Sequence, residues 1–261
     1  MMDVKKKKVI GLVSAAVLLL LCLSGYLLLS KGQRYRKVSF SVRYTSDTLI
    51  TAEDLKVYVA ENCKPIVGQL KRNVSLPQLE NRICRWPYVD SVVITTDIRG
   101  GMHIDAVQAD IILRVMDASG RSYYLARKGN VGRVLPYMPG RPVRTLVASG
   151  NITGAQPSEL VRELEDTSVV YDLMLIASRI SESPFWSAQI GQIYVKAKGN
   201  YQLVPTVGSH LIELGGADQL ERKFENLWNI YTQGFNVTGW QRYAKVSLQY
   251  GDRVPCKKRT I

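Results

Sequence analysis

Histidine and cysteine, the residues that most often carry catalysis or bind metals, are scarce in this sequence. Its 261 residues include two histidines and four cysteines. Among Cys22, Cys63, Cys84 and Cys256 there is no CxxC pair or other zinc-ligand spacing, so the sequence predicts no metal site. Cys63 and Cys84 fall at the ends of two adjacent predicted helices, where either a disulfide or two small buried side chains would fit.

Arrangements that would support catalysis or cofactor binding are also lacking. His103 lies beside Asp105 on an alternating strand, which is typical of a solvated or structural histidine. Ser209 and His210 are neighbours at the start of a predicted strand. The side chains of neighbouring strand residues point to opposite faces, so these two cannot act together. The glycine pairs of the chain lack the GxGxxG and GxxxxGK patterns of phosphate loops. We therefore predict no catalytic residues, no cofactor and no enzymatic activity.

Acidic residues are outnumbered by basic ones, 22 against 35, which gives a formal net charge of +13. The excess gathers at the ends of the chain: residues 1–37 hold eight lysines and arginines against Asp3 alone, and the segment 253–259 adds four more. Lysines and arginines beside an apolar segment are explained by anionic lipid headgroups. The charge therefore does not indicate nucleic-acid binding.

Charged residues are absent from Val9 to Leu29, directly after the lysines at 5–8. At 1.5 Å per residue this segment of about 21 residues spans roughly the 30 Å hydrocarbon core of a bilayer, and no small-x-small cleavage site follows it. Basic residues flank both sides, but long C-terminal domains translocate largely regardless of charge. We predict a cytoplasmic tail at 1–8, one transmembrane helix at 9–29 in the inner membrane, a juxtamembrane linker at 30–37 and a periplasmic body.

The segment after this linker predicts a strand-helix-helix-strand-strand module. Val38 to Tyr44 alternates apolar and polar residues, as a half-buried strand does. Thr51 and Asp54 form a capping-box-like pair at the start of a helix, and a second helix stops at Trp86-Pro87. Two alternating strands then complete a domain at 38–115.

A second domain is predicted at 116–256, with an antiparallel sheet and flanking helices. After a hairpin and a strand comes the longest helical period of the periplasmic body, from Pro157 to Ile176. Three strands between Gln189 and Leu214, separated by glycine turns, indicate a meander, and a helix from Ala217 to Tyr231 follows. Residues 257–261 read as a basic tail. The predicted fold class is α+β behind a single transmembrane helix.

The last predicted strand, Tyr243 to Tyr250, is the candidate binding site. Tyr243, Lys245, Ser247 and Gln249 would point away from the core, because side chains alternate along a strand. A terminal strand often lies at a sheet edge, where a partner can add a strand to unpaired N–H and C=O groups. An equally good interpretation is that Lys245 only protects this edge from aggregation.

A series of short strings follows in a fixed order along the chain. They are Leu79-Glu80, Trp86 to Val92, Gln108 to Val115, Tyr123 to Leu125 with Gly129, Leu203 to Gly208, Ile212 to Gly215 and Val246 to Tyr250. These strings occur in a chain with one predicted membrane span, a strand-helix-helix-strand-strand module and a second β-rich domain. In this combination the chain resembles the FtsQ (DivIB) family of bacterial division proteins. Residues 38–115 resemble a POTRA domain, although Asp110 stands where the family usually has proline.

This resemblance implies a non-enzymatic scaffold of the division complex. Such a scaffold binds FtsB- and FtsL-like single-pass division proteins outside the membrane and is linked through them to the septal peptidoglycan synthase FtsW with FtsI. In the family, the final strand of the second domain takes up FtsB by strand addition, and the POTRA-like module contributes to recruitment. Carried to this chain, the implied partner-binding residues are Tyr243, Lys245, Ser247, Gln249, Tyr250 and Val254.

Two other functions remain open from the sequence. A membrane-tethered cell-wall enzyme would use Glu163 or Glu221 as a general acid, although helical spacing also explains both as solvated positions. A POTRA-type protein of outer-membrane assembly would normally carry several such modules and a C-terminal barrel, which the helical patterns after Val115 do not suit.

Overall fold

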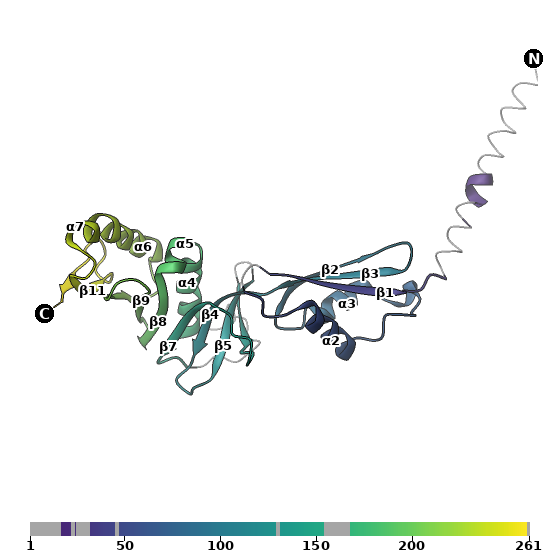
Figure 1. Ribbon diagram of the computed structural model, residues 1–261, viewed down its shortest axis with the longest axis horizontal. Helices are drawn as coiled ribbons and strands as arrows, with labels where there is room; N and C mark the ends of the chain where they lie inside the picture. The colour runs from purple at the N-terminus through teal and green to yellow at the C-terminus, as the bar shows by residue number, and fades with distance from the viewer. Residues whose placement is uncertain are drawn as a thin grey trace, which may run out of the picture. The chain divides into compact units, whose positions relative to one another are not determined.

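The structure is a computed structural model that describes residues 17–21, 24, 32–44, 47–128, 131–153 and 168–259 (Figure 1). These residues divide into two compact units. The first takes in the described residues up to Arg43 together with Ile50–Val107, and the second takes in Tyr44–Leu49 and the chain from Gln108 onwards.

The predicted transmembrane helix at 9–29 lies outside the described residues, except for 17–21 and 24, which are helical. Within the described part of the chain, none of the helices has both the length and the apolar character that crossing a bilayer requires. The span, the tail at 1–8 and the orientation therefore remain predictions.

The first unit has the element order that its sequence predicts. Its elements are β1 (Lys37–Arg43), α2 (Ala52–Asn62), the 3-10 turn η1 (Lys71–Asn73), α3 (Leu76–Ile83), β2 (Val89–Thr96) and β3 (Gly101–Gln108). The strands form a three-stranded sheet in the order β1-β3-β2, in which β1 and β3 run parallel. Cys63 and Cys84 follow α2 and α3 as separate half-buried thiols, without a disulfide between them.

Local sequence signals fix where the first helix begins. The hydroxyl oxygen of Thr51 accepts a hydrogen bond from the Asp54 N–H at 3.2 Å, and the Asp54 carboxylate accepts one from the Thr51 N–H at 2.7 Å. This reciprocal pair confirms the predicted capping box of α2. The buried residues of the two helices repeat at helical spacing: Leu55 and Val59 in α2, and Leu79 and Ile83 in α3.

The second unit is built on a nine-stranded sheet in the order β12-β11-β10-β9-β8-β7-β4-β5-β6. The strands are β4 (Asp110–Met116), β5 (Ser122–Lys128), β6 (Val131–Pro136), β7 (Leu146–Gly150), β8 (Ile190–Ala197), β9 (Asn200–Pro205), β10 (Leu211–Gly215), β11 (Tyr243–Ser247) and β12 (Cys256–Lys258). The predicted meander is confirmed, because β8, β9 and β10 are antiparallel neighbours.

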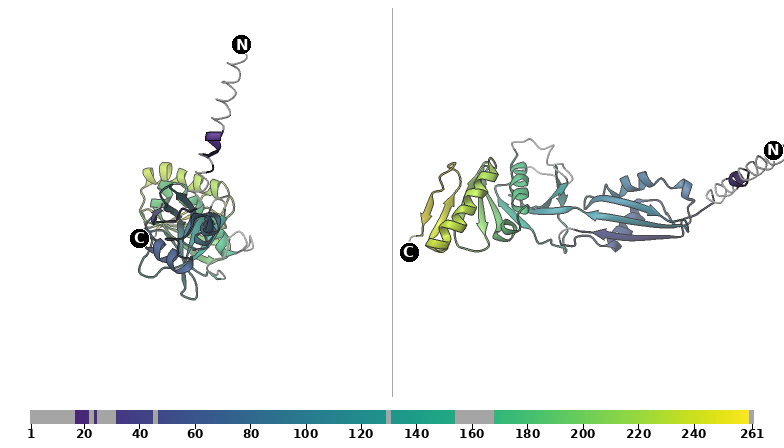
Figure 2. Two further views of the ribbon diagram at one scale, coloured as in Figure 1. Left: turned by 90° about the vertical axis from the view of Figure 1, so that its right-hand side faces the viewer. Right: turned by 90° about the horizontal axis from the view of Figure 1, so that it is seen from above.

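The sheet is mixed, and the prediction of an antiparallel sheet is wrong. The pairs β4–β7, β7–β8 and β10–β11 are parallel. Parallel neighbours need a crossover connection. Two of these three connections carry helices. Along the chain, α4 (Val169–Ser181) and α5 (Pro184–Gln189) come after β7 and before β8, and α6 (Leu220–Asn229), the π-helical η2 (Ile230–Phe235) and α7 (Asn236–Thr238) come after β10 and before β11 (Figures 1 and 2). The connection from β4 to β7 consists of β5 and β6.

The core of the second unit lies between this sheet and the crossover helices. It joins buried residues of β4, β5, β8, β9 and β10 with those of α4 and α6, including Leu173, Ile176, Phe224 and Leu227. The helical period predicted from Pro157 is described only from Ser168, whose hydroxyl accepts a hydrogen bond from the Tyr171 N–H at 3.1 Å and caps α4.

One strand belongs to a different unit from the one that the sequence suggests. β4 falls within the predicted domain at 38–115, but it pairs with β5 and β7 of the large sheet. Its successive residues Ile111, Ile112 and Leu113 are 4%, 6% and 0% exposed. Such burial on both faces suits an interior strand of a covered sheet, which a half-exposed module does not offer.

We predict that Thr51→Ala destabilises the first unit by about 1 kcal/mol, because the substitution removes the cap that satisfies the Asp54 N–H. Thr51→Ser keeps the hydroxyl oxygen and is the matched control. Urea denaturation followed by far-UV circular dichroism measures both. Equal unfolding midpoints for the two variants would show that the capping box contributes nothing.

Candidate protein-interaction edge

The strand β11, which the sequence places at the edge of the sheet, has a neighbour on each side. It pairs in parallel with β10, where Leu211 lies opposite Lys245. It also pairs antiparallel with β12, where Lys258 lies opposite Tyr243. The prediction that β11 is the open edge is therefore wrong. The reason is that a turn at 250–253 folds the C-terminal segment back along β11 and occupies its second side.

The edge at this end of the sheet is β12. The Pro255 carbonyl accepts a hydrogen bond from the Ser247 N–H at 3.0 Å, and the Arg259 N–H donates to the residue before β11 at 2.9 Å. Main-chain groups alternate in direction along a strand, so those of Cys256 and Lys258 point away from β11. Within the described residues no further strand lies beyond β12. Cys256 and Lys258 therefore offer the N–H and C=O groups to which another strand can add.

The predicted residues of β11 lie behind this edge. Tyr243 packs against the core, with its ring stacked on Phe235 at a centroid distance of 5.4 Å, and Ser247 is 7% exposed. Tyr243 therefore does not point away from the core as predicted. Ser247 lies between the core residues Val246 and Leu248, so by alternation it points to the opposite face, as predicted. The register of β11 shifts between Tyr243 and Lys245, and such a bulge separates Tyr243 from the alternation that Lys245, Val246 and Ser247 keep.

The remaining predicted residues flank the turn between β11 and β12. Gln249 and Tyr250 are exposed, Tyr250 by 62%. Val254 is half-buried and packs against the core. The six predicted residues thus belong to one hairpin, but in this hairpin Tyr250 and Gln249 are accessible while Tyr243 and Ser247 provide support.

The exposed charge at this edge is positive. Lys257, Lys258 and Arg259 come from the segment predicted as a basic tail, and all three are exposed. Behind them the Lys245 ammonium donates a hydrogen bond to the Glu213 carboxylate at 2.9 Å. That bond is the main reason why the pKa of Glu213 lies below its ordinary value. Because Glu213 is already neutralised by Lys245, the outer cations favour an acidic partner.

Side-chain hydrogen bonds hold both ends of the β11–β12 hairpin. The amide of Asn226 on α6 donates to the Gly251 carbonyl in the turn at 3.0 Å. The Arg259 guanidinium, directly after β12, donates to the Ser209 carbonyl before β10 at 2.8 Å. A strand fixed at both ends loses little conformational entropy when a partner binds it.

Next to β10 and β11, an aromatic cluster surrounds a buried histidine. The Tyr231 hydroxyl and the His210 Nε2 are 2.8 Å apart, and the rings of Phe235 and Trp240 lie 5.0 Å and 6.4 Å from the imidazole. Burial lowers the pKa of His210 and raises the pKa of Tyr231 to about 12. Both groups are uncharged at neutral pH, which suits a packing role. Tyr231 and Phe235 belong to the π-helical η2.

The other histidine lies in a polar ladder on the first unit. Ser39 Oγ is 2.9 Å from His103 Nδ1, and Ser41 Oγ is 3.1 Å from His103 Nε2. The Asp105 carboxylate accepts a hydrogen bond from the Ser41 hydroxyl at 2.9 Å. The imidazole of His103 thus contacts the two serines, and the carboxylate contacts Ser41. The side chains therefore form a surface ladder between β1 and β3, without the order of a Ser-His-Asp triad.

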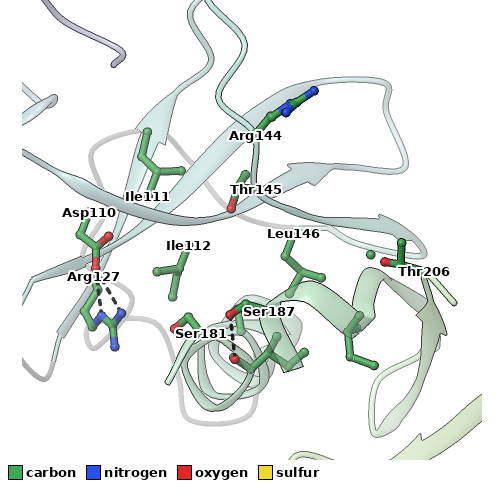
Figure 3. Close-up of a pocket in the computed structure, with 14 residues that line it drawn as sticks. Asp110, Ile111, Ile112, Arg127, Arg144, Thr145, Leu146, Ser181, Ser187 and Thr206 are labelled. Carbon is green, nitrogen blue, oxygen red and sulfur yellow. Dashed lines mark hydrogen bonds and ion pairs between the residues drawn. The ribbon is translucent and has the colours of Figure 1, made fainter. Parts of the chain in front are cut away.

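A cavity of about 530 Å³ in the second unit is lined by the starts of β4, β7 and β8 and by α4 and α5 (Figure 3). Its polar groups bind other parts of the fold. Arg127 forms an ion pair with Asp110 at 3.2 Å, and the Ser187 hydroxyl donates to the Ile180 carbonyl at 3.1 Å. Among the lining residues no carboxylate is placed to act as a base for a hydroxyl. The cavity thus offers space without a catalytic arrangement.

Of the two candidate acids of the enzyme hypothesis, the structure describes only Glu221. Glu221 is exposed on α6, as its helical spacing predicts, and Glu163 lies outside the described residues. Among the residues that the structure describes, no three His, Cys, Asp or Glu side chains are grouped to hold a metal ion.

The family model described as FtsQ/DivIB, C-terminal related, matches residues 111–257. The chain belongs to this family. The match begins in β4 and ends in β12. It therefore covers the part of the chain that builds the large sheet, including the candidate edge. FtsQ/DivIB proteins are membrane-associated, non-enzymatic division proteins. Membership therefore indicates a role in bacterial cell division, with partners in the division machinery.

The FtsQ/DivIB match does not extend to the first unit. The likeness of residues 38–115 to a POTRA domain therefore remains a prediction, although the order of strands and helices is as expected. No individual curated protein matches the chain.

Sequence reasoning missed Cys256 and Lys258, the residues with outward main-chain groups. β12 has three residues, too few for an alternating pattern to show. A usable signal was Gly251-Asp252, which lies between the segments that form β11 and β12. Such a pair is typical of a hairpin connection, and equally of the end of a strand.

We predict that His210 makes stability depend on pH. Its pKa is lowered in the fold, so the unfolded chain binds a proton first as pH falls below about 6.5. The free energy of unfolding should then decrease by up to about 1.4 kcal/mol per pH unit until the folded form is protonated too. His210→Phe should remove this dependence between pH 5 and about 7.

Urea denaturation at a series of pH values measures the effect. Tyr231→Phe retains the imidazole and serves as the control, and His103 is present in every variant, so its contribution cancels. An unchanged pH profile in His210→Phe would contradict the prediction.

Proposed function

We propose that this FtsQ/DivIB-family chain is a non-enzymatic scaffold of the division complex that binds FtsB- and FtsL-like single-pass proteins by strand addition to β12. Through them it is linked to the septal peptidoglycan synthase FtsW with FtsI. The proposal includes one span at 9–29 in the inner membrane, a cytoplasmic N-terminus and a periplasmic body. The family supports the division role, and the free side of β12 is the observation that carries the binding step.

The geometry of β12 supports strand addition in three ways. Its outward groups lie on Cys256 and Lys258, its ends are held by Asn226 and Arg259, and its exposed cations suit an acidic strand. In this proposal the partner meets β12 and exposed residues of the turn such as Tyr250. Lys245, Ser247 and Tyr243 position β12 from behind, which changes their role from the one that the resemblance implies.

The alternatives have weaker support. Outer-membrane assembly is not favoured by the FtsQ/DivIB match, and a cell-wall enzyme is not favoured by the exposed, unpaired environment of Glu221. The structure offers no observation that specifically favours either.

We predict that Lys258→Pro weakens binding of an FtsB-like partner by about tenfold, because proline removes the outward N–H and one main-chain hydrogen bond with it. Lys258→Gln keeps the N–H and removes the charge, so it should weaken binding less. The Arg259 N–H bond that holds β12 is separate from this group. Co-purification and titration with the full chain measure both variants.

Full binding of FtsB-like and FtsL-like partners by Lys258→Pro would exclude the β12 edge. Deletion after Val254 removes the strand altogether and is the positive control for loss of binding. Near-UV circular dichroism of each variant shows whether the aromatic cluster remains packed.

Depletion of the chain in its native cell should arrest division and give filaments, because septal synthesis would lose its link to the scaffold. Microscopy with fluorescent cell-wall labelling measures this outcome. Restoration by the unaltered chain but not by the deletion after Val254 would connect the phenotype to β12. Normal septation on depletion would contradict the division role.

A further inference from the structure

The first unit contains an apolar groove that the proposed function does not use. The groove has a volume of about 320 Å³ and lies between β1 and α2. Its lining includes Val38 and Phe40 from β1, Val59 and Ala60 from α2, and Ile66 and Val67 from the loop after α2. No lining residue comes from β2 or β3, so the groove borders the outer side of β1. Figure 1 shows the course of β1 and α2, the two elements that line it.

The strand beside this groove has one open side. β1 is the outermost strand of its sheet and pairs with β3 alone among the described strands. The Arg36 N–H donates to the Gly100 carbonyl at 2.7 Å, which fixes the even-numbered residues as those facing β3. By alternation, Ser39 and Ser41 direct their main-chain N–H and C=O groups to the outside.

The chain itself shows that this outer side accepts an antiparallel neighbour. Just before β1, the Tyr35 N–H donates to the Gln69 carbonyl at 3.0 Å, and the Tyr35 carbonyl accepts from the Gly68 N–H at 2.8 Å. The neighbouring segment bends at Gly68, which has a φ of 86°, and lines the groove through Pro65, Ile66 and Val67. Further along the same segment, Pro65 has no N–H to donate. Pairing that begins at Tyr35 therefore stops where the groove opens.

Side chains at this edge favour a partner whose apolar residues alternate. Val38 and Phe40 are half-buried on the groove side of β1. On the opposite face, the Ser39 and Ser41 side chains are held by His103. A strand added beside Ser39 and Ser41 would place every second side chain over Phe40, in the groove.

The charge around the groove identifies the chemistry of that strand further. Lys56 and Lys64 line it and are exposed. The nearby acid Glu53 forms an ion pair with Lys56 at 2.9 Å, with side chains 71% and 58% exposed, so it is easily exchanged for another carboxylate. We propose that β1 and this groove bind an extended segment of a partner protein, with alternating apolar and acidic residues, as an added antiparallel strand.

This binding site is independent of β12, because it uses main-chain groups and an apolar groove of the first unit. A second strand-binding edge lets one chain hold two extended partner segments at once. The two sites differ in their selection: exposed lysines and an arginine surround β12, whereas β1 adds a groove that selects apolar side chains.

The test uses the full chain and a short fluorescent peptide of alternating valine and glutamate, with fluorescence polarisation as the readout. Ala60→Trp fills the groove and should weaken peptide binding by about tenfold or more. Val57→Trp is the matched control, because Val57 lies on the same helix, is 47% exposed and does not line the groove. This control should bind the peptide as the unaltered chain does.

Three further measurements separate the origins of binding. Lys56→Glu with Lys64→Glu should weaken the peptide and leave the fold intact, as shown by far-UV circular dichroism. Hydrogen exchange should show that the peptide protects the Ser39 and Ser41 amides. A peptide that alternates valine and lysine should bind at least about tenfold more weakly than the glutamate peptide if charge contributes as proposed.

Several results would overturn the proposal. They are equal peptide binding by Ala60→Trp and Val57→Trp, exchange protection confined to β12, groove-dependent binding of phosphatidylglycerol vesicles in place of the peptide, or groove-dependent self-association of the chain. Lys258→Pro serves to separate the two sites. It should leave peptide binding unchanged, and Ala60→Trp should leave binding of the FtsB-like partner unchanged.

Discussion

Continuous main-chain hydrogen bonding across the nine-stranded sheet is the constraint on which the second unit depends. Each buried strand must satisfy its main-chain N–H and C=O groups on both sides. Where the neighbouring strand runs parallel, the chain has to cross over the sheet to reach it. The crossovers between β7 and β8 and between β10 and β11 carry the helices that bury the core. The same requirement moves unpaired main-chain groups to the outermost strands, so the return of the chain after β11 makes β12 the candidate site.

Edges of this kind are hazards as well as binding sites, and both β12 and β1 carry protection. β12 is short and includes two exposed lysines, and β1 begins with Lys37 and ends with Arg43. Exposed charge at an edge opposes indiscriminate pairing, because a like-charged strand would be repelled. It therefore also makes the edge selective for an acidic strand, so that protection and recognition follow from the same residues.

Polar groups inside the second unit mainly hold elements together. The Tyr201 hydroxyl donates to the Asp172 carboxylate at 2.5 Å and joins β9 to α4, and burial raises the pKa of Tyr201. The buried Lys223 of α6 donates to the Gly216 carbonyl at 2.9 Å and ties the helix to the loop before it. In these pairs, as in the contact between His210 and Tyr231, residue types that are often catalytic have a structural role. They fix the helices that support the β11–β12 hairpin.

The sequence by itself determined the features that depend on neighbouring residues. The Thr51 cap, the meander of β8 to β10 and the helix after Ala217 follow from local hydrogen bonding and from the period of helices and strands. Only the tertiary structure decided that β4 joins the large sheet, that three strand pairs are parallel, that Tyr243 faces the core and that β12 covers β11. The pairing of strands joins residues far apart in sequence, and a bulge shifts the side-chain alternation, so neither is fixed by local pattern.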